Sequence, residues 1–223
     1  IRTFHEGHQD WDGKPMDLSA FCPTELDCDN WIRTIKKAGM TYAILVCKHH
    51  DGFANWPSKY TDYSVANTPW KDGRGDVVRE FVNACRKYDI RVGLYYSPAE
   101  AGYQKRSPKE HDDYFIDQIS ELLTNYGKID YLWFDGCGSE GHEYDRKRII
   151  HAIRSLQPEI LIFNMWDPDT KWVGNEAGVA DRRNSNVVSA VDFSVLAKVQ
   201  EDLDTKRFLP TECDFRMRSR NWF

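Results

Sequence analysis

Apolar runs and helical patterns of hydrophobic residues take turns along this chain. Residues 27–38 carry apolar side chains at helical spacing, with Asp27 in the N-cap position and Gly39 after the last turn. An uninterrupted apolar run at residues 42–47 follows. The pattern predicts an amphipathic helix followed by a buried strand.

The same order recurs three more times. Further helices are expected at residues 76–88, 107–126 and 145–156, and further strands at residues 91–97, 131–135, 160–163 and, weakened by Pro210, 208–212. Hydrophobic strands joined by helices in units of roughly 30 to 50 residues predict right-handed crossovers and a parallel sheet.

Such a sheet is either open and doubly wound or closed as a (β/α)₈ barrel, and the polar residues favour the barrel. Chemically capable side chains follow nearly every expected strand: His49 and His50, Ser97 and Glu100, Asp135, Asn164 and Trp166, and Glu212. A barrel builds its site from many such loops. A doubly wound sheet uses one switch point, and its glycine-rich phosphate turn is missing here.

We therefore predict an α/β fold of the (β/α)₈ barrel type, with residues 1–223 forming one catalytic domain or most of one and no second domain. Five expected strands do not close an eight-stranded barrel, so we expect the first strand and the last strands to lie outside this chain.

Composition narrows the function classes. The chain has 223 residues, with 30 Lys and Arg against 35 Asp and Glu, a net charge of −5 that argues against a nucleic-acid partner. The chain contains no run of 18 apolar residues, so the sequence predicts no membrane-spanning helix. The 13% of aromatic residues suits a surface that stacks on sugars.

The six cysteines form no C-x-x-C pair, which removes the common zinc and thioredoxin-like interpretations. Buried free thiols are the simplest interpretation. An even count leaves one or two disulfides possible.

His49 and His50 follow the first strand and are candidate binding residues. Titratable neighbours cannot all be buried without partners, so they line a polar cleft or face solvent. Adjacent strand residues point to opposite faces, and no H-x-H or H-E-x-x-H spacing supports a metal. We favour histidines that bind hydroxyl groups and expect no metal or cofactor. A structural pair and a metal pair stay open as alternatives.

Two carboxylates are the candidate catalytic groups. Strand alternation places Trp133 and Asp135 on one face, although Asp135 could instead cap the next loop. Glu176 lies in a glycine-rich stretch at 171–178 and could be an ordinary loop residue. Together, two carboxylates over aromatic rings form the minimal set for glycoside hydrolysis.

Several segments resemble the α-L-fucosidases of glycoside hydrolase family 29. The segments run in family order over nearly the whole chain: FCPTELDCDNW, AGMTYAILVCKHHDGFANWPSKYTDYSV, GDVVREFVNACRKYDIRVGLYYS, DYLWFDG and KWVGNEAG. The most specific is HHDGF followed by WPSKYTDYS. The resemblance implies a (β/α)₈-like barrel, often followed by a β-sandwich, and retaining hydrolysis of terminal α-L-fucose.

On the matching positions, the resemblance implies Asp135 as nucleophile and Glu176 as acid/base. A W-V-G-N-E loop is similar to that of the subgroup preferring α-1,3- or α-1,4-linked fucose. The sugar contacts it implies are His49, His50, Trp56, Tyr95 and Trp133, with Trp11 in the place of a family Glu-Trp pair that here is Asp10-Trp11. The implied partner is a fucosylated oligosaccharide or glycoconjugate, and the implied location is secreted or periplasmic.

Two rival functions stay open. The chain begins just after the family's first-strand sugar ligand and ends before the last strands, so it could be a non-catalytic fucose-binding fragment of such an enzyme. A metal-dependent hydrolase built on His49, His50 and Asp51 is the weaker rival.

Overall fold

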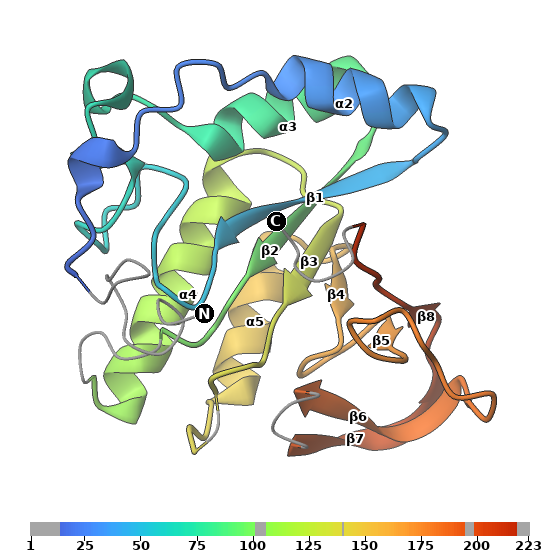
Figure 1. Cartoon of the computed structure of the whole chain (residues 1–223). Coiled ribbons are helices and arrows are strands. Elements are labelled where there is room, and N and C mark those ends of the chain that lie inside the picture. Colours follow the sequence, from blue (N-terminus) through green and yellow to red (C-terminus); the bar gives the residue numbers. More distant parts are fainter. Residues whose placement is uncertain (1–13, 101–105, 140, 195–198, 218–223) are drawn as a thin grey trace.

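The structure is a computed structural model that describes residues 14–100, 106–139, 141–194 and 199–217 (Figure 1). Four strands form a parallel sheet whose spatial order is the chain order: β1 (Tyr42–Lys48), β2 (Arg91–Tyr96), β3 (Tyr131–Phe134) and β4 (Leu161–Phe163). These are the first four strands expected from the sequence. Because all four run in one direction, their carboxyl ends meet at one edge of the sheet.

The four expected helices are also present: α2 (Cys28–Lys37), α3 (Val77–Lys87), α4 (Pro108–Asn125) and α5 (Arg146–Leu156). Each begins at a side chain that accepts a backbone N–H, namely Asp27, Asp76, Ser107 and Asp145. At α4, Ser107 and Glu110 form a complete capping box ahead of Pro108. Local capping therefore fixes where each helix starts.

The helices cover one face of the sheet. The main core lies between them and the strands, and its fully buried members include Ile32 of α2, Phe115 and Leu122 of α4, and Phe134 of β3. Figure 1 shows α4 and α5 behind the strands, and α3 at the top of the molecule beside α2. A doubly wound sheet is covered on both faces, whereas a barrel wall has its helices outside only. The arrangement is that of a barrel wall.

The opposite face carries the residues that alternation predicts there. Tyr42, Val46 and Leu161 are 45, 41 and 44% exposed on it. In the register of the sheet, Tyr95 lies beside Val46 and Trp133, and Trp133 lies beside Phe163. A row of large side chains therefore crosses all four strands on this face.

The segment after β4 differs from the sequence expectation. Strand β5 (Lys171–Trp172) pairs in parallel with β8 (Thr211–Glu212), and an antiparallel hairpin of β6 (Val187–Ser194) and β7 (Val199–Phe208) lies between them in the chain. The expected single strand at 208–212 was wrong in extent. The chain stops pairing with β6 at Phe208 and pairs with β5 from Thr211, and Pro210 between them has no N–H to donate but accepts the Lys171 N–H at 2.9 Å.

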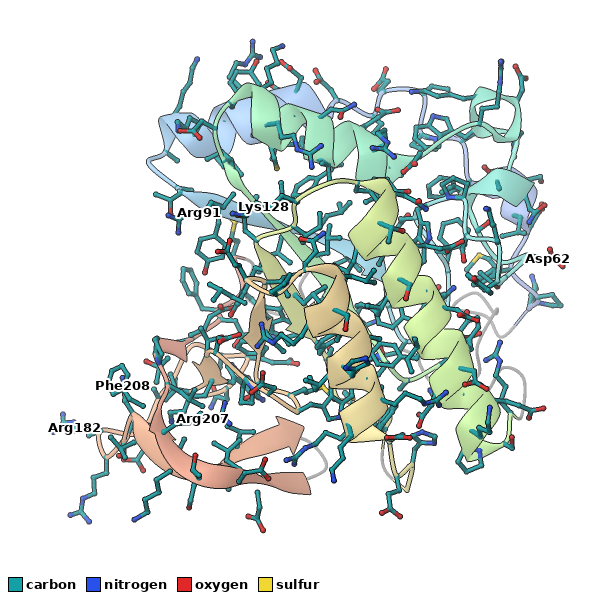
Figure 2. All side chains as sticks on the ribbon, turned by 180° about the vertical axis from the view of Figure 1, so that it is seen from behind. Asp62, Arg91, Lys128, Arg182, Arg207 and Phe208 are labelled. Carbon is teal, nitrogen blue, oxygen red and sulfur yellow. The ribbon has the colours of Figure 1, made fainter. Side chains whose placement is uncertain are left out.

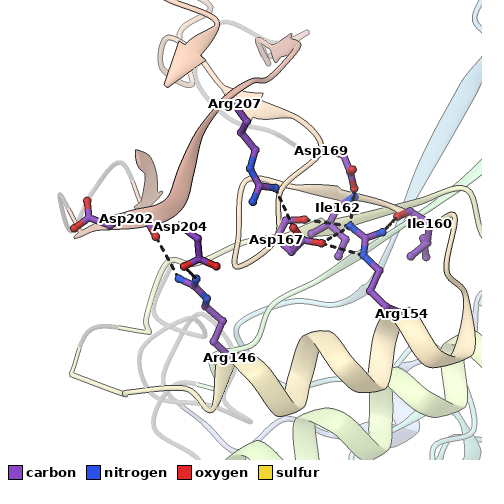
Figure 3. Close-up of polar contacts among 9 residues, drawn as sticks. All are labelled: Arg146, Arg154, Ile160, Ile162, Asp167, Asp169, Asp202, Asp204 and Arg207. Carbon is purple, nitrogen blue, oxygen red and sulfur yellow. Dashed lines mark hydrogen bonds and ion pairs between the residues drawn. The ribbon is translucent and has the colours of Figure 1, made fainter. Parts of the chain in front are cut away.

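Ion pairs attach this hairpin to the rest of the molecule (Figure 3). Asp167, in the loop before β5, forms ion pairs with Arg154 of α5 at 2.9 Å and with Arg207 of β7 at 3.0 Å. Arg154 also reaches Asp169 at 3.0 Å, and Arg146 reaches Asp204 at 3.0 Å. We call Arg154, Asp167, Asp169 and Arg207 the Asp167 network.

Three short 3₁₀ helices complete the elements: η1 (Leu18–Ala20), η2 (Val65–Asn67) and η3 (Trp70–Gly73). In Figure 2, Arg91 and Lys128, at the amino-terminal edge of the sheet, lie on the other side of the molecule from Asp62 in the loop after β1. Within the described ranges, none of the helices has the length and apolar character needed to cross a membrane.

The six cysteines are free thiols. Cys28, Cys47 and Cys85 are buried, as the simplest interpretation of the sequence expected, and Cys22 and Cys213 are exposed. Burial raises the pKa of Cys28 to about 11 and that of Cys85 to about 12, so these thiols stay protonated at neutral pH.

Candidate functional site

Asp135 follows the last residue of β3, at the carboxyl edge of the sheet. Its backbone N–H donates to the carbonyl of Tyr96 at 3.3 Å, which extends the ladder by one residue. The Tyr95 hydroxyl donates to Oδ2 at 2.6 Å, and the Cys137 backbone N–H donates to Oδ1 at 3.0 Å. His50 Nε2 lies 3.4 Å from the same Oδ2. The carboxylate is therefore held from three directions while 26% of its side chain is exposed.

The protonation of His50 follows from its contacts. The Ser97 hydroxyl donates to the carbonyl of Ala99 at 3.0 Å, so its oxygen is left to accept the Nδ1–H of His50 at 2.5 Å. Burial disfavours a charged ring, but the hydrogen bond and charge of Asp135 and a contact with Cys137 outweigh it. The pKa of His50 rises to about 9, and the ring is an imidazolium at neutral pH.

Asp135 is the matching anion. Burial alone would raise its pKa, yet the hydrogen bond and charge of His50 and the Tyr95 hydroxyl hold the pKa below the usual 3.8. The carboxylate therefore stays ionised at neutral pH. An ionised, partly exposed carboxylate fixed at the end of a strand is able to act as a nucleophile.

His49 has the opposite charge state from its neighbour. Burial, and then the adjacent His50, lowers the pKa of His49 to about 4, so this ring is neutral. The His50 backbone N–H donates to Nδ1 of His49 at 2.9 Å. Since Nδ1 is an acceptor, the ring proton lies on Nε2, which can donate to a hydroxyl group.

Aromatic rings form a stacked row beside these groups. His49 stacks on Tyr95 at 5.4 Å between centroids, Tyr95 on Trp133 at 5.2 Å, and Trp133 on Phe163 at 4.3 Å. The rings come from the end of β1 and from β2, β3 and β4 in turn, so the strand register creates the row. Because neighbouring rings face one another, the row presents apolar ring edges beside the carboxylate, and these can pack against the apolar faces of a sugar ring.

Glu212 of β8 fixes the middle of this row. One carboxylate oxygen accepts the Trp133 indole N–H at 2.8 Å, and the other accepts the Tyr131 hydroxyl at 2.8 Å. Both oxygens are thereby engaged, and the side chain orients Trp133 rather than facing open space.

Glu176 lies in a turn just after β5. Its side chain is exposed, and Asn175 Oδ1 shapes the turn by accepting the N–H groups of Ala177 at 3.0 Å and Val179 at 3.2 Å. Within the described residues, no hydrogen bond or ion pair joins Glu176 to Asp135. The start of β5 is parallel to the end of β4 through the bridge between Phe163 and Thr170. The turn itself packs against the segment after β8, where Gly174 lies close to Cys213 and Gly178 close to Phe215.

One candidate sugar contact, Trp56, is not part of this cluster. Trp56 is 1% exposed in the main core, where its indole N–H donates to Glu121 of α4 at 2.9 Å. That position is structural, because Glu121 also receives the Lys59 backbone N–H at 2.9 Å. Trp11 lies outside the described residues.

His49, His50 and Asp135 each offer one ligand atom, and these atoms lie within 4.8 Å of one another. In the described part of the chain this is the one cluster of three or more His, Cys, Asp or Glu side chains with the spacing to hold a metal ion, and Asp51 is not in it. A cation would have to displace the Nε2 proton of His50, which Asp135 stabilises. The contacts fit an imidazolium and carboxylate pair.

Comparison with known proteins identifies the family of this chain. A sequence model described as alpha-L-fucosidase matches residues 5–201. The chain belongs to the α-L-fucosidase family. It is 36% identical over 226 residues to alpha-L-fucosidase 1 of Arabidopsis thaliana, which covers 96% of this chain and 44% of the plant protein. The chain thus spans less than half the length of this plant relative.

Solved structures of α-L-fucosidase relatives share the fold. A putative alpha-L-fucosidase from Bacteroides thetaiotaomicron superposes with a TM-score of 0.81 at 38% identity, covering 97% of this chain and 50% of that one. A glycoside hydrolase 29 family member from an unknown rumen bacterium gives 0.74 at 36% identity, covering 97% and 42%. The expected (β/α)₈ barrel class is confirmed, and the chain forms part of such a barrel.

Sequence reasoning missed several contributors to the candidate site. Phe163, Ser97 and Glu212 were recognised as strand-end residues or strand members, but their contacts with Trp133 and His50 were not. For Phe163, the signal in the sequence was the alternation of side-chain direction along the strand ILIF, which decides the face of the sheet on which its ring lies. Nothing local indicates that Glu212 meets Trp133, because 79 residues separate them.

Proposed function

We propose that the protein carrying this chain is a retaining exo-α-L-fucosidase that removes terminal α-1,3- or α-1,4-linked L-fucose from glycans. Family membership supports a fucosylated glycan as the substrate class. The observation that carries the proposal is the ionised Asp135, held by His50 and Tyr95 beside the aromatic row. The W-V-G-N-E segment around Glu176 supports the linkage preference.

In the first step, a carboxylate oxygen of Asp135 bonds to the anomeric carbon of fucose as the glycosidic C–O bond breaks. Glu176 transfers its proton to the departing oxygen, which leaves with the aglycone as a hydroxyl. Release of the leaving group on the side opposite Asp135 inverts the anomeric carbon once.

In the second step, a water molecule gives a proton to Glu176 and attacks the anomeric carbon. The bond to Asp135 breaks, the carboxylate is regenerated, and the second inversion restores the α configuration. Neutral His49 donates its Nε2–H to a sugar hydroxyl, and the rings of Tyr95 and Trp133 contact the sugar.

The test uses two variants of the full-length protein with an aryl α-L-fucoside and added azide. Asp135→Ala should lose at least about 10³-fold in kcat, and azide acting in place of the missing nucleophile should yield β-fucosyl azide. Glu176→Ala should keep turnover of substrates with good leaving groups and yield α-fucosyl azide, because Asp135 still forms the intermediate.

Each result bears on one residue. Full turnover in Asp135→Ala would remove Asp135 as the nucleophile. Loss of all turnover in Glu176→Ala without azide rescue, or no change at all, would remove Glu176 as the acid/base. Fucose binding by the unaltered protein with no hydrolysis would instead support the non-catalytic alternative.

A further inference from the structure

A buried charge cluster lies behind the candidate site, on the helix-covered side of β1. Lys48, the last residue of β1, has its Nζ 3.6 Å from Glu100 Oε2, and the two side chains are 0 and 1% exposed. Arg106 approaches the same oxygen at 3.5 Å. The Lys48 ammonium also lies 4.5 Å from the ring centroid of Tyr96 and 5.2 Å from that of Tyr114.

Burying the charges of Lys48 and Glu100 costs free energy, and few hydrogen bonds offset that cost here. Among the described residues, Lys48 Nζ and both carboxylate oxygens of Glu100 have no hydrogen-bond partner. Burial lowers the pKa of Lys48 to about 8 despite the nearby Glu100 charge. Replacing a buried ion pair with uncharged residues of similar volume is often neutral or stabilising. Stability therefore does not explain why charges occupy this place.

The position of Lys48 and Glu100 next to the segment that carries His50 points to a role in the candidate site. The Lys48 carbonyl accepts the Ser97 N–H at 2.9 Å, and Ser97 holds Nδ1 of His50. Glu100 lies directly beneath Gly52, whose φ is +86°, and a Cβ at residue 52 would be 2.8 Å from the Glu100 Cγ. Glu100 thus packs under the segment that carries the histidines, while Lys48 immediately precedes it.

We propose that Lys48 and Glu100 are positioning residues that hold His50 against Asp135 by joining the carboxyl ends of β1 and β2 beneath the site. The assignment deepens the proposed function and rests on it. The ion pair draws the loop after β2 toward the end of β1, which fixes Ser97 and, through it, the His50 ring. Neither residue touches the carboxylate of Asp135 itself.

The experiment replaces both charges at constant shape, as Lys48→Met with Glu100→Gln, in the full-length protein. With the pair gone, kcat/KM for an aryl α-L-fucoside should fall about 10-fold or more, because a displacement of about 1 Å in a positioned group costs up to about 10²-fold. The thermal midpoint should stay the same or rise. Loss of stability alone would not produce this combination.

A second readout follows His50 by NMR of ¹⁵N-labelled histidine and does not need activity. A ring that moves away from Asp135 should titrate below the value of about 9 and closer to 6.5. The charged or titratable groups near the two sites are Asp135, Cys137 and His49 around His50, and Glu100, Arg106, Asp51 and His111 around Lys48. Of these groups, the double variant removes only Glu100, which lies beside Lys48, and it leaves every group beside His50 in place.

The matched control removes an exposed pair between α2 and α3, Lys87→Met with Asp29→Asn, and should change neither kcat/KM nor the His50 titration. Unchanged kcat/KM and unchanged titration in the double variant would overturn the positioning role. If the double variant does not fold, Lys48→Met alone gives the same decision, because Glu100 then keeps its ion pair with Arg106. If the parent releases no fucose, the proposed function fails, yet the His50 titration still decides the positioning role.

Discussion

The His50 ring is buried between Ser97 and Asp135, and this position determines its charge. The folded pKa of about 9 exceeds the unfolded value of 6.5, so folding takes up a proton at His50 between these two pH values. Its contribution to the free energy of unfolding is therefore complete below pH 6.5 and is lost as the pH rises through 9. Asp135 behaves in the opposite sense, since its lowered pKa adds stability that is lost only in acid.

We expect His50→Gln to show this dependence. The difference in free energy of unfolding between parent and variant should be roughly 3 kcal/mol larger at pH 6 than above pH 9, from 1.36 kcal/mol per pKa unit. Urea unfolding of both proteins at pH 6, 8 and 9.5 measures it. His151→Gln, on an exposed position of α5, should change stability by less than about 0.5 kcal/mol. A pH-independent difference at His50 would contradict the imidazolium assignment.

At the scale of elements, local sequence patterns predicted the helices and strands that local interactions stabilise. Helices α2 to α5 and strands β1 to β4 carry their own caps and apolar runs, so each could be placed from the sequence within a few residues. Strands β5 and β8 have two residues each, and contacts such as Trp133 to Glu212 and Trp172 to Asp214 hold them. These partners are distant in sequence, so no local pattern could reveal them.

The β6–β7 hairpin was missed for a related reason. Its small cluster of Val191, Leu203 and Leu209 is separate from the main core, and ion pairs attach it to α5. The Asp167 network (Figure 3) is therefore a main attachment of the hairpin. The turn with Glu176 lies between β5 and β6, so this attachment holds one end of the connection that carries the proposed acid.

Asp167→Asn tests this role, because it takes the shared anion away from Arg154 and Arg207. We expect faster amide hydrogen exchange in β6 and β7, unchanged exchange in α2 and α3, and a several-fold lower kcat/KM. The control is Asp204→Asn, which loses a single ion pair to Arg146 from a side chain that is 83% exposed and should have almost no effect. Equal exchange rates in parent and Asp167→Asn would show that the hairpin is held by other contacts.

At the scale of the whole molecule, the sheet separates two tasks. The helix-covered face contains the main core, and the opposite face and the carboxyl edge carry Asp135 and the aromatic row. The sequence predicted this division because alternation along YLWFD assigns Leu132 and Phe134 to one face and Trp133 and Asp135 to the other. It could not assign Trp56, whose large ring lies in the core through its bond to Glu121.

Because the core and the candidate site lie on opposite faces of the sheet, we expect a substitution in the core to lower stability without changing catalysis. Leu122 of α4 is 0% exposed in the main core, and Leu122→Ala should lower the free energy of unfolding by about 2 to 5 kcal/mol through lost burial and a cavity. Well below its unfolding temperature, the variant should keep the parent kcat/KM, because Asp135, His50 and Tyr95 are held by their own hydrogen bonds. Leu156→Ala, at a 39% exposed position, controls for the loss of a leucine and should cost less than about 1 kcal/mol. A large fall in kcat/KM for folded Leu122→Ala would show that packing behind the sheet also sets the geometry of the site.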